Sequence, residues 1–285
     1  MSKGIFDPAL LDLEKETFAF WGPKSFREYL SKNNLPKVNT AQYISVDSLE
    51  RLNPSLREND VMVLRLGASK GKGTQFGLVK VIDRLKDFFL LDAELFGEMV
   101  GHTFLPTSSY YKLYPFHLIP SSSETSLVNF AFASGLIHHA LGLDREYEVS
   151  TPATGSSAYT FKIRPHSELD REIIHNNGQV QVDAIFIGQK EGEQIIFVVE
   201  AKVSNKYESI AKHKLVYPML GIAANVPLDM SISPIYMKVL HDKDGLHFFL
   251  VECTYPDPRD RLAGIDELSV VNCHHLIIPQ QIWHV

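Results

Sequence analysis

Two apolar segments separated by a short turn constrain the fold of this chain most strongly. They read QVQVDAIFIG over residues 179–188 and EQIIFVVEAK over residues 193–202. The second holds an unbroken apolar run at 195–199, which is typical of a central strand buried on both faces. Because only a short turn separates the segments, we expect an antiparallel hairpin at the centre of a sheet.

The residues around this hairpin predict helices and strands in alternation. A Ser121-x-x-Glu124 capping box opens the first helix, and Gly142 is a plausible stop. The predicted elements are, in order, a helix over 124–142, strands near 158–164, 179–187 and 194–202, a helix near 206–224, and strands at 235–240 and 246–253. This order predicts an α/β domain with a mixed central sheet flanked by helices.

The N-terminal part has a different pattern. Short helices are expected over 8–34, interrupted by WGPK at 21–24. Two strand-like runs at 61–67 and 75–83, joined by a glycine-rich loop, predict a hairpin. A stretch rich in proline and serine at 106–123 suggests a boundary. We therefore expect an N-terminal α+β domain at 1–115 and a second domain at 116–285.

Three charged residues in the central hairpin are candidates for chemistry. Glu200 and Lys202 are two apart on one strand, so their side chains point to the same face. Asp183 joins that face if it pairs with Glu200 or Val198, whereas a slip of one residue would send it to the other face. Two carboxylates suit Mg²⁺, and a neighbouring lysine could orient or deprotonate a water, which together favour phosphodiester hydrolysis.

A simpler interpretation of the same residues is a solvated ion pair at the end of a strand. Charges at strand ends are often exposed, and an aspartate followed at a distance by Glu-x-Lys arises by chance. The apolar run before Glu200 argues for function, because burying a charge there is costly unless the charge is used.

Asp183 followed by Glu200-Ala201-Lys202 resembles the signature of the PD-(D/E)XK nucleases, the restriction-endonuclease-like fold. Their core runs helix, three strands, helix, strand, as predicted here. The runs IIFVVEAK, KHKLVYPML and LVECTYPDPRDRL are further similar to putative type II restriction endonucleases. The resemblance covers roughly residues 120–285.

The resemblance implies a role for each matching residue. Asp183 and Glu200 would be metal ligands, the carbonyl of Ala201 a third, and Lys202 the catalytic lysine. Mg²⁺ would be the cofactor, with Mn²⁺ expected to substitute. Many such nucleases place an acid on the first helix, where Glu124 is the candidate, and a helix cap is the alternative. Two departures stand out, Val182 in place of the motif's proline and Lys214 in place of an expected glutamine.

Basic residues elsewhere are candidates for contact with DNA. Lys70 and Lys72 lie in the glycine-rich loop of a segment, 61–86, that carries six basic residues and one acid. The spacing of this loop does not match a P-loop. Lys214 and Tyr217 share a face of the helix after Glu-x-Lys and could line a DNA groove. A solvated surface is the alternative for both groups.

Charge, apolar runs and cysteine content indicate the class of protein and its location. The net charge of −6 argues against a uniformly basic DNA-binding surface but allows a local basic groove. No apolar run is long enough to span a membrane, and acids near the start replace the apolar stretch of a signal peptide. The two cysteines, Cys253 and Cys273, form no disulfide framework or standard zinc pattern and are expected in strands. We expect a cytoplasmic protein.

These features together predict a Mg²⁺-dependent endonuclease acting on double-stranded DNA. A type II restriction enzyme is the leading role, with a cognate DNA methyltransferase as genetic partner and a homodimer on palindromic DNA. One alternative is a repair or junction-resolving nuclease. Another is a catalytically silent DNA-binding module with the same fold.

Overall fold

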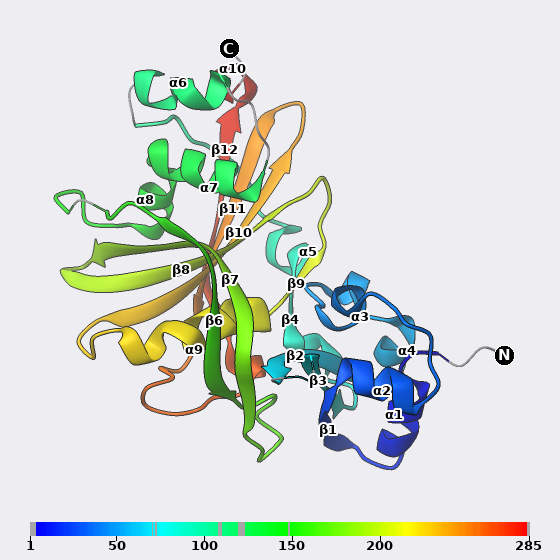
Figure 1. The fold of residues 1–285 in the computed structure, drawn as a ribbon. Coiled ribbons are helices and arrows are strands. Elements are labelled where there is room, and N and C mark those ends of the chain that lie inside the picture. The colour runs from blue at the N-terminus through cyan, green and yellow to red at the C-terminus, as the bar shows by residue number, and fades with distance from the viewer. Residues whose placement is uncertain are drawn as a thin grey trace.

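A large mixed sheet organises the computed structural model of the chain (Figure 1). The structure describes residues 4–69, 71, 73–107, 110–118, 123–147 and 149–283. Ten strands form this sheet, with the path β1-β3-β2-β7-β8-β10-β11-β12-β5 and β6 paired to β7. The chain therefore has the expected mixed α/β architecture, a large mixed sheet flanked by helices.

The strands of this sheet differ widely in length. Their bounds are β1 Phe18–Ser25, β2 Val61–Ser69, β3 Gly73–Val81, β5 His102–Thr103, β6 Ala153–Ile163, β7 Ile173–Lys190, β8 Glu193–Val203, β10 Ser231–His241, β11 Gly245–Thr254 and β12 Ser269–Pro279. The short strands β4 Phe89–Leu91 and β9 Ser209–Ala211 form a separate pair. The predicted strands at 158–164, 179–187, 194–202, 235–240 and 246–253 are confirmed as parts of β6, β7, β8, β10 and β11.

The N-terminal part adds an antiparallel three-stranded unit to the sheet. β2 and β3 form the predicted hairpin, and β1 pairs with β3. The sequence reading missed β1, since residues 21–24 were interpreted only as a break between helices. The unit meets the rest of the sheet at one parallel pair, Gly67 with Asn176. A Cβ on Gly67, whose φ is +80°, would lie 2.1 Å from the Asn176 carbonyl oxygen, so this approach requires glycine.

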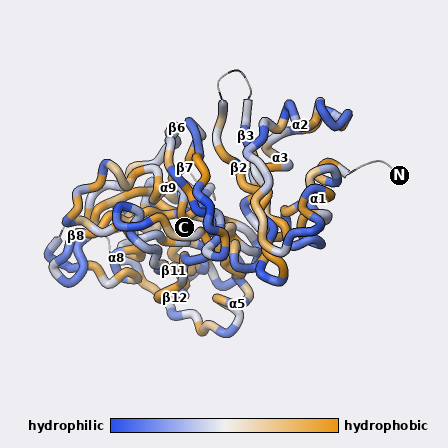
Figure 2. Tube along the Cα trace, turned by 90° about the horizontal axis from the view of Figure 1, so that it is seen from below, coloured by the Kyte–Doolittle hydropathy of each residue, from blue (hydrophilic) through white to orange (hydrophobic). Residues whose placement is uncertain are grey.

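Helices cover both faces of the sheet. The α-helices are α1 Asp7–Leu13, α2 Phe26–Lys32, α3 Thr40–Ile44, α4 Pro54–Arg57, α5 Asp92–Phe96, α6 Tyr110–Leu118, α7 Glu124–Ala133, α8 Leu136–Leu141, α9 His213–Ile222 and α10 Gln280–Trp283. None of the helices described in these ranges has the length and apolar character needed to cross a membrane. Hydrophobic residues are frequent along the strands in the middle of the molecule (Figure 2).

Two hydrophobic cores lie on the opposite faces of the central strands. Ala184, Phe197 and Val199 of β7 and β8 pack in the core that contains α7 and α8. The other core joins α9 to the N-terminal part, with Leu215 and Met219 in the same cluster as residues of β2 and β3. The apolar run at 195–199 is thus confirmed as a central strand, since β8 lies between β7 and β10.

Several details differ from the sequence-based expectations. The predicted helix near 206–224 is shorter, because β9 precedes α9 and the chain turns before His213. The predicted helix over 124–142 is divided into α7 and α8 by Gly135, although Gly142 ends α8, as expected, and adopts a left-handed conformation. Cys253 is buried in β11 and Cys273 is half-buried in β12, and both thiols are free.

Candidate functional site: an acid–lysine cluster at the end of the central hairpin

The register of the β7–β8 hairpin brings the two predicted carboxylates together. The ladder ends at the pair Ala184–Val199, so the next opposed residues are Asp183 and Glu200. Side chains alternate along a strand, and Ala184 and Val199 face the core under α7 and α8. Asp183 and Glu200 therefore point to the opposite face, where α9 packs. This is one of the two registers that the sequence analysis favoured.

Hydrogen bonds fix the carboxylate of Asp183 in place. One oxygen, Oδ2, accepts from the backbone N–H of Ala201 at 2.8 Å, and the other accepts from Nε2 of Gln181 at 3.0 Å. Asp183 is 5% exposed. The side chain therefore ties β7 to β8 beyond the last ladder pair and holds its carboxylate beside Glu200.

Glu200 is buried but incompletely paired. Its side chain is 4% exposed, and Oε1 lies 3.0 Å from Nζ of Lys214. The other oxygen, Oε2, is buried and has no hydrogen-bond partner. Burial raises the pKa of Glu200 to about 7, against the lowering effect of the Lys214 ammonium. Burial alone would lower the pKa of Lys214, but the carboxylates of Glu200, Asp183 and Asp47 together raise it.

Lys202 lies at the centre of three carboxylates. Its Nζ is 3.7 Å from Asp47, 3.8 Å from Glu124 and 3.9 Å from Glu200. The last contact confirms that Glu200 and Lys202 share a face. The Lys202 side chain is 26% exposed, so it can be reached from solvent while it stays held by its neighbours. We call Asp47, Glu124, Asp183, Glu200, Lys202 and Lys214 the acid–lysine cluster.

Glu124 reaches the cluster from the first residue of α7. The helix begins at this residue, and its N-cap is Ser123, whose hydroxyl accepts from the N–H of Ser126. The predicted capping box was therefore wrong: Glu124 occupies the first helical position, three residues after Ser121, which lies outside the described residues. An acidic side chain in the first turn still stabilises a helix. Glu124 therefore has two roles, because it stabilises the start of α7 and also contacts Lys202.

Asp47 is the member of the cluster that the sequence analysis missed. It comes from the N-terminal part, in the segment between α3 and the following short helix. One carboxylate oxygen approaches Lys202 and also Arg51, at 3.1 Å, and the other is buried without a partner. No local pattern marks Asp47, since only the packing of the N-terminal part against β8 and α9 brings it here.

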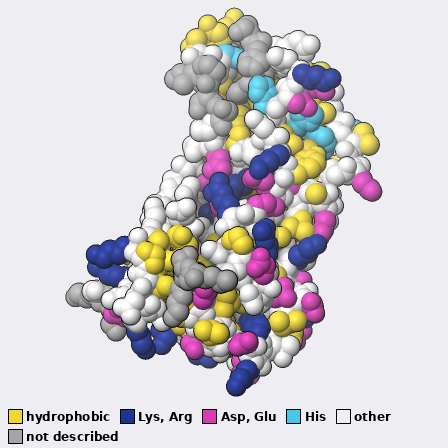
Figure 3. Space-filling model, turned by 90° about the vertical axis from the view of Figure 1, so that its right-hand side faces the viewer, with side chains coloured by type: hydrophobic (Ala, Val, Ile, Leu, Met, Phe, Trp, Pro, Cys, Tyr) yellow, Lys and Arg dark blue, Asp and Glu magenta, His cyan; other side chains and the backbone are white. Residues whose placement is uncertain are grey.

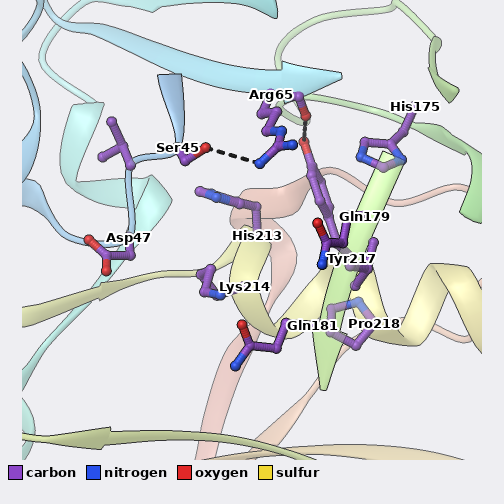
Figure 4. Close-up of a pocket in the computed structure, with 12 residues that line it drawn as sticks. Ser45, Asp47, Arg65, His175, Gln179, Gln181, His213, Lys214, Tyr217 and Pro218 are labelled. Atoms are coloured by element: carbon purple, nitrogen blue, oxygen red, sulfur yellow. Dashed lines mark hydrogen bonds between the residues drawn. The ribbon is translucent and has the colours of Figure 1, made fainter. Parts of the chain in front are cut away.

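The helix α9 lines a cavity beside the cluster (Figure 4). Lys214 and Tyr217 both line it, so the sequence analysis placed them correctly on one face of the helix. Tyr217 is buried, and its O–H donates to the backbone oxygen of Arg65 at 3.5 Å. The cavity holds about 220 Å³ and is lined by Ser45, Val46, Asp47, Arg65, His175, Gln179, Val180, Gln181, His213, Lys214, Tyr217 and Pro218.

The basic segment at 61–86 is less available than its composition suggested. Lys70 and Lys72 lie outside the described residues. Lys80 is buried, and its ammonium donates to the backbone oxygens of Leu13 and Glu14. Arg84 pairs with Asp87 and Glu168. Lys80 and Arg84 are therefore engaged within the protein, and contact of Lys70 and Lys72 with DNA stays a prediction.

Charged side chains of both signs gather on the face of the molecule shown in Figure 3. Within the described ranges, no group of three or more His, Cys, Asp or Glu side chains is arranged as a metal site. The oxygen donors present at the cluster are the carboxylates of Asp183 and Glu200, the carboxylates around Lys202 and the carbonyl of Ala201. Chemically, the cluster combines a buried, incompletely paired carboxylate with two lysines.

Comparison with known proteins places the chain in a family. A family model described as "Domain of unknown function (DUF6997)" matches residues 104–272, which is more than half of the chain. No curated protein and no solved structure matches the chain. The matched segment contains Glu124, Asp183, Glu200, Lys202 and Lys214 but not Asp47. The chain belongs to the family of the domain of unknown function DUF6997.

Proposed function

We propose that this protein is a Mg²⁺-dependent DNA endonuclease with a restriction-endonuclease-like core. The order of elements supports the proposal, because α7 and α8, then β6, β7 and β8, then α9 and β10 follow the helix, three strands, helix, strand order of that core. The connection through α9 makes β10 parallel to β8, whereas β6 pairs with β7 and β7 pairs with β8 in antiparallel orientation.

The observation that carries the proposal is the convergence of Asp183, Glu200 and Lys202 on one face at the end of a buried hairpin. Buried carboxylates are normally fully hydrogen-bonded, and an exception calls for an explanation such as an ion. The free Oε2 of Glu200 is such an exception. Carboxylate oxygens are the ligands that Mg²⁺ prefers, and it often uses only one or two of them with several waters.

The residues that would hold the ion are Asp183, Glu200 and the carbonyl of Ala201. When bound there, Mg²⁺ would polarise a phosphoryl oxygen and favour formation of hydroxide from water. Asp183 is fixed by the N–H of Ala201, so its carboxylate is oriented before any ligand arrives. The Oε1 of Glu200 is held by Lys214, which leaves Oε2 as the oxygen available to the ion.

Lys202 would act on the water and on the phosphate. Its ammonium is positioned by Asp47, Glu124 and Glu200, each within 4.0 Å, and part of it faces solvent. A lysine so placed can orient the attacking water and offset the negative charge that develops on the phosphoryl oxygens. Glu124 and Asp47 would then act through Lys202, as positioning residues, rather than on the substrate.

Among nucleases, we propose a type II restriction enzyme that cuts double-stranded DNA in the cytoplasm. The basis is the similarity of the segments around Glu200 and on α9 to such enzymes. That role carries two expectations, a cognate DNA methyltransferase that protects the host and a homodimer on a palindromic site.

The test is a nuclease assay with purified protein on duplex, branched and single-stranded DNA, in Mg²⁺, Mn²⁺ or EDTA. Cleavage of duplex at fixed positions, lost in EDTA, supports the restriction role. Preference for branched or single-stranded DNA would instead support a repair or junction-resolving nuclease. DNA binding without cleavage of any form in either metal would overturn the enzymatic proposal and favour a silent DNA-binding module.

A further inference from the structure

The cavity beside the acid–lysine cluster is formed by two distant parts of the chain. One wall comes from the N-terminal part, with Ser45, Asp47 and Arg65, and the other from β7 and α9 (Figure 4). Its volume, about 220 Å³, is below the roughly 300–1,000 Å³ of pockets that hold drug-sized ligands. A single small, flat group therefore fits this space better than an extended ligand.

Polar atoms without partners are concentrated around this cavity. Of the seven buried side-chain atoms that lack a hydrogen bond among the described residues, four belong to its lining. They are Oδ1 of Asp47, Nε of Arg65, Nδ1 of His175 and Nδ1 of His213. His175 is 2% exposed and His213 is 8% exposed, so bulk solvent does not satisfy these atoms. Such a concentration indicates a site built for a ligand with hydrogen-bonding edges.

Aromatic rings of the lining pack against one another and against Phe161. The ring of His175 stacks on Phe161 with centroids 4.5 Å apart and an interplanar angle of 10°. Tyr217 lies 5.1 Å from His175 and 5.2 Å from His213, measured between ring centroids. Flat rings beside unpaired donors and acceptors suit a planar heterocycle.

The signs of these groups argue against an inorganic anion as the ligand. The Asp47 carboxylate is an acceptor that would repel phosphate. The charged donors of the lining are Arg65 and Lys214, and Lys214 is already paired with Glu200. Burial lowers the pKa of His175 to about 4 and that of His213 to about 3, so both rings are neutral near pH 7. A neutral ligand that both donates and accepts hydrogen bonds fits this lining better than a phosphate group.

We propose that this cavity is a nucleobase pocket that receives one unstacked base of the bound DNA. Enzymes that extrude a base hold it in such a pocket, by stacking and by hydrogen bonds to its edge. The inference rests on the proposed function, because it assumes that DNA occupies the neighbouring cluster. Asp47 and Lys214 belong to both sites, and Gln181 of the lining donates to Asp183. The extruded base is therefore that of a nucleotide adjoining the phosphate at the cluster.

The test measures binding in EDTA, so that cleavage is not needed. Two duplexes are compared at low salt, one fully paired and one with a single mismatched 2-aminopurine, whose base is easy to extrude. We expect the wild type to bind the mismatched duplex roughly tenfold more tightly, because extruding a mismatched base costs less than extruding a paired one. The fluorescence of 2-aminopurine should change on binding, because the base leaves its stack in the duplex.

Two variants and one control test whether the preference for the mismatched duplex comes from this cavity. His175→Phe keeps a ring against Phe161 but removes the imidazole nitrogens. Gln179→Leu changes an exposed residue of the lining and serves as the test if His175→Phe does not fold. Each should lose the preference for the mismatched duplex. The control, Gln194→Leu, changes an exposed glutamine at the far end of β8 and should behave as wild type.

The outcomes separate this inference from the proposed function. Equal affinity for the two duplexes and unchanged fluorescence would overturn the nucleobase pocket, and metal-dependent cleavage would still stand. A preference that persists in both variants would also overturn it. Failure to bind any duplex at low salt would overturn the pocket together with the proposed function.

Discussion

Two buried carboxylates in this molecule, Asp92 and Glu200, have very different surroundings. Asp92 is 0% exposed and Glu200 is 3% exposed, so both are removed from solvent. At Asp92 both oxygens are used: Lys238 lies 3.0 Å away, the O–H of Tyr236 donates at 2.9 Å, and the N–H of Glu208 donates at 3.0 Å. At Glu200 one oxygen pairs with Lys214 and the other has no partner.

This difference separates a structural charge from a candidate functional one. Asp92 begins α5 and joins it to β10 and to the segment before β9, so it connects the N-terminal part with the central sheet. Its charge is balanced inside the protein. Burial raises the pKa of Glu200 to about 7, and its unpartnered Oε2 is left for a ligand. Incomplete pairing of a buried acid with a perturbed pKa is a physical reason to expect function there.

The largest expected effect is on stability, at Asp92. Asp92→Ala leaves the ammonium of Lys238, which is 1% exposed, buried without its partner. We expect it to lower the free energy of unfolding by about 3–5 kcal/mol. At pH 4.5 Glu200→Gln should change it by about 1 kcal/mol or less, because the raised pKa keeps the wild-type side chain largely neutral, as glutamine is. Urea denaturation measures both, and similar losses for the two variants would remove the distinction between the sites.

The pH dependence of stability sharpens the same comparison. The pKa of Glu200 is raised in the folded protein to about 7 from an ordinary value of 4.5. Its contribution to stability is therefore fully present below about pH 4.5 and is lost as the pH rises toward about 7. We expect the wild type to lose up to about 1.4 kcal/mol per pH unit relative to Glu200→Gln in this range.

Comparing the two proteins in EDTA isolates this group, because the buried histidines titrate equally in both. Urea denaturation from pH 4.5 to 8 gives the difference in unfolding free energy at each pH. A difference that stays constant over the whole range would contradict the raised pKa of Glu200.

A smaller effect on stability is expected at Lys202. Its side chain is 26% exposed, and its three ion pairs lie at 3.7–3.9 Å, so Lys202→Ala should cost about 1 kcal/mol or less. DNA cleavage should nevertheless be lost. Lys202→Arg should not restore it, because the planar guanidinium has a different shape and a higher pKa. A Lys202→Ala protein that unfolds would instead support a structural ion-pair network.

Much of the central sheet could be predicted because its signals are local. The apolar run at 195–199 and the short turn before it predicted the β7–β8 hairpin, and the spacing of Glu200 and Lys202 predicted their common face. β1 was missed because Gly22 and Pro23 indicate a break, and only pairing with β3 makes this segment a strand. The helix near 206–224 was placed too early, since β9 forms only by pairing with β4.

The candidate site was predictable only in part, for the same physical reason. Asp183, Glu200 and Lys202 lie on two adjacent strands, so register alone brings them together. Asp47 and Arg65 reach the site through contacts between distant segments, which no spacing in the sequence encodes. The free Oε2 of Glu200 and the buried histidine nitrogens are likewise properties of packing.

The most direct test of the central claim is the single-turnover rate of DNA cleavage in Mg²⁺ by Glu200→Gln, beside wild type and the Gln194→Leu control. Removing a metal ligand's charge should lower the rate at least about a hundredfold, while binding to DNA is kept or strengthened. Asp183→Asn should behave in the same way, and the control should cut at the wild-type rate. Cleavage by Glu200→Gln at the wild-type rate would contradict the assignment of the acid–lysine cluster as the catalytic site.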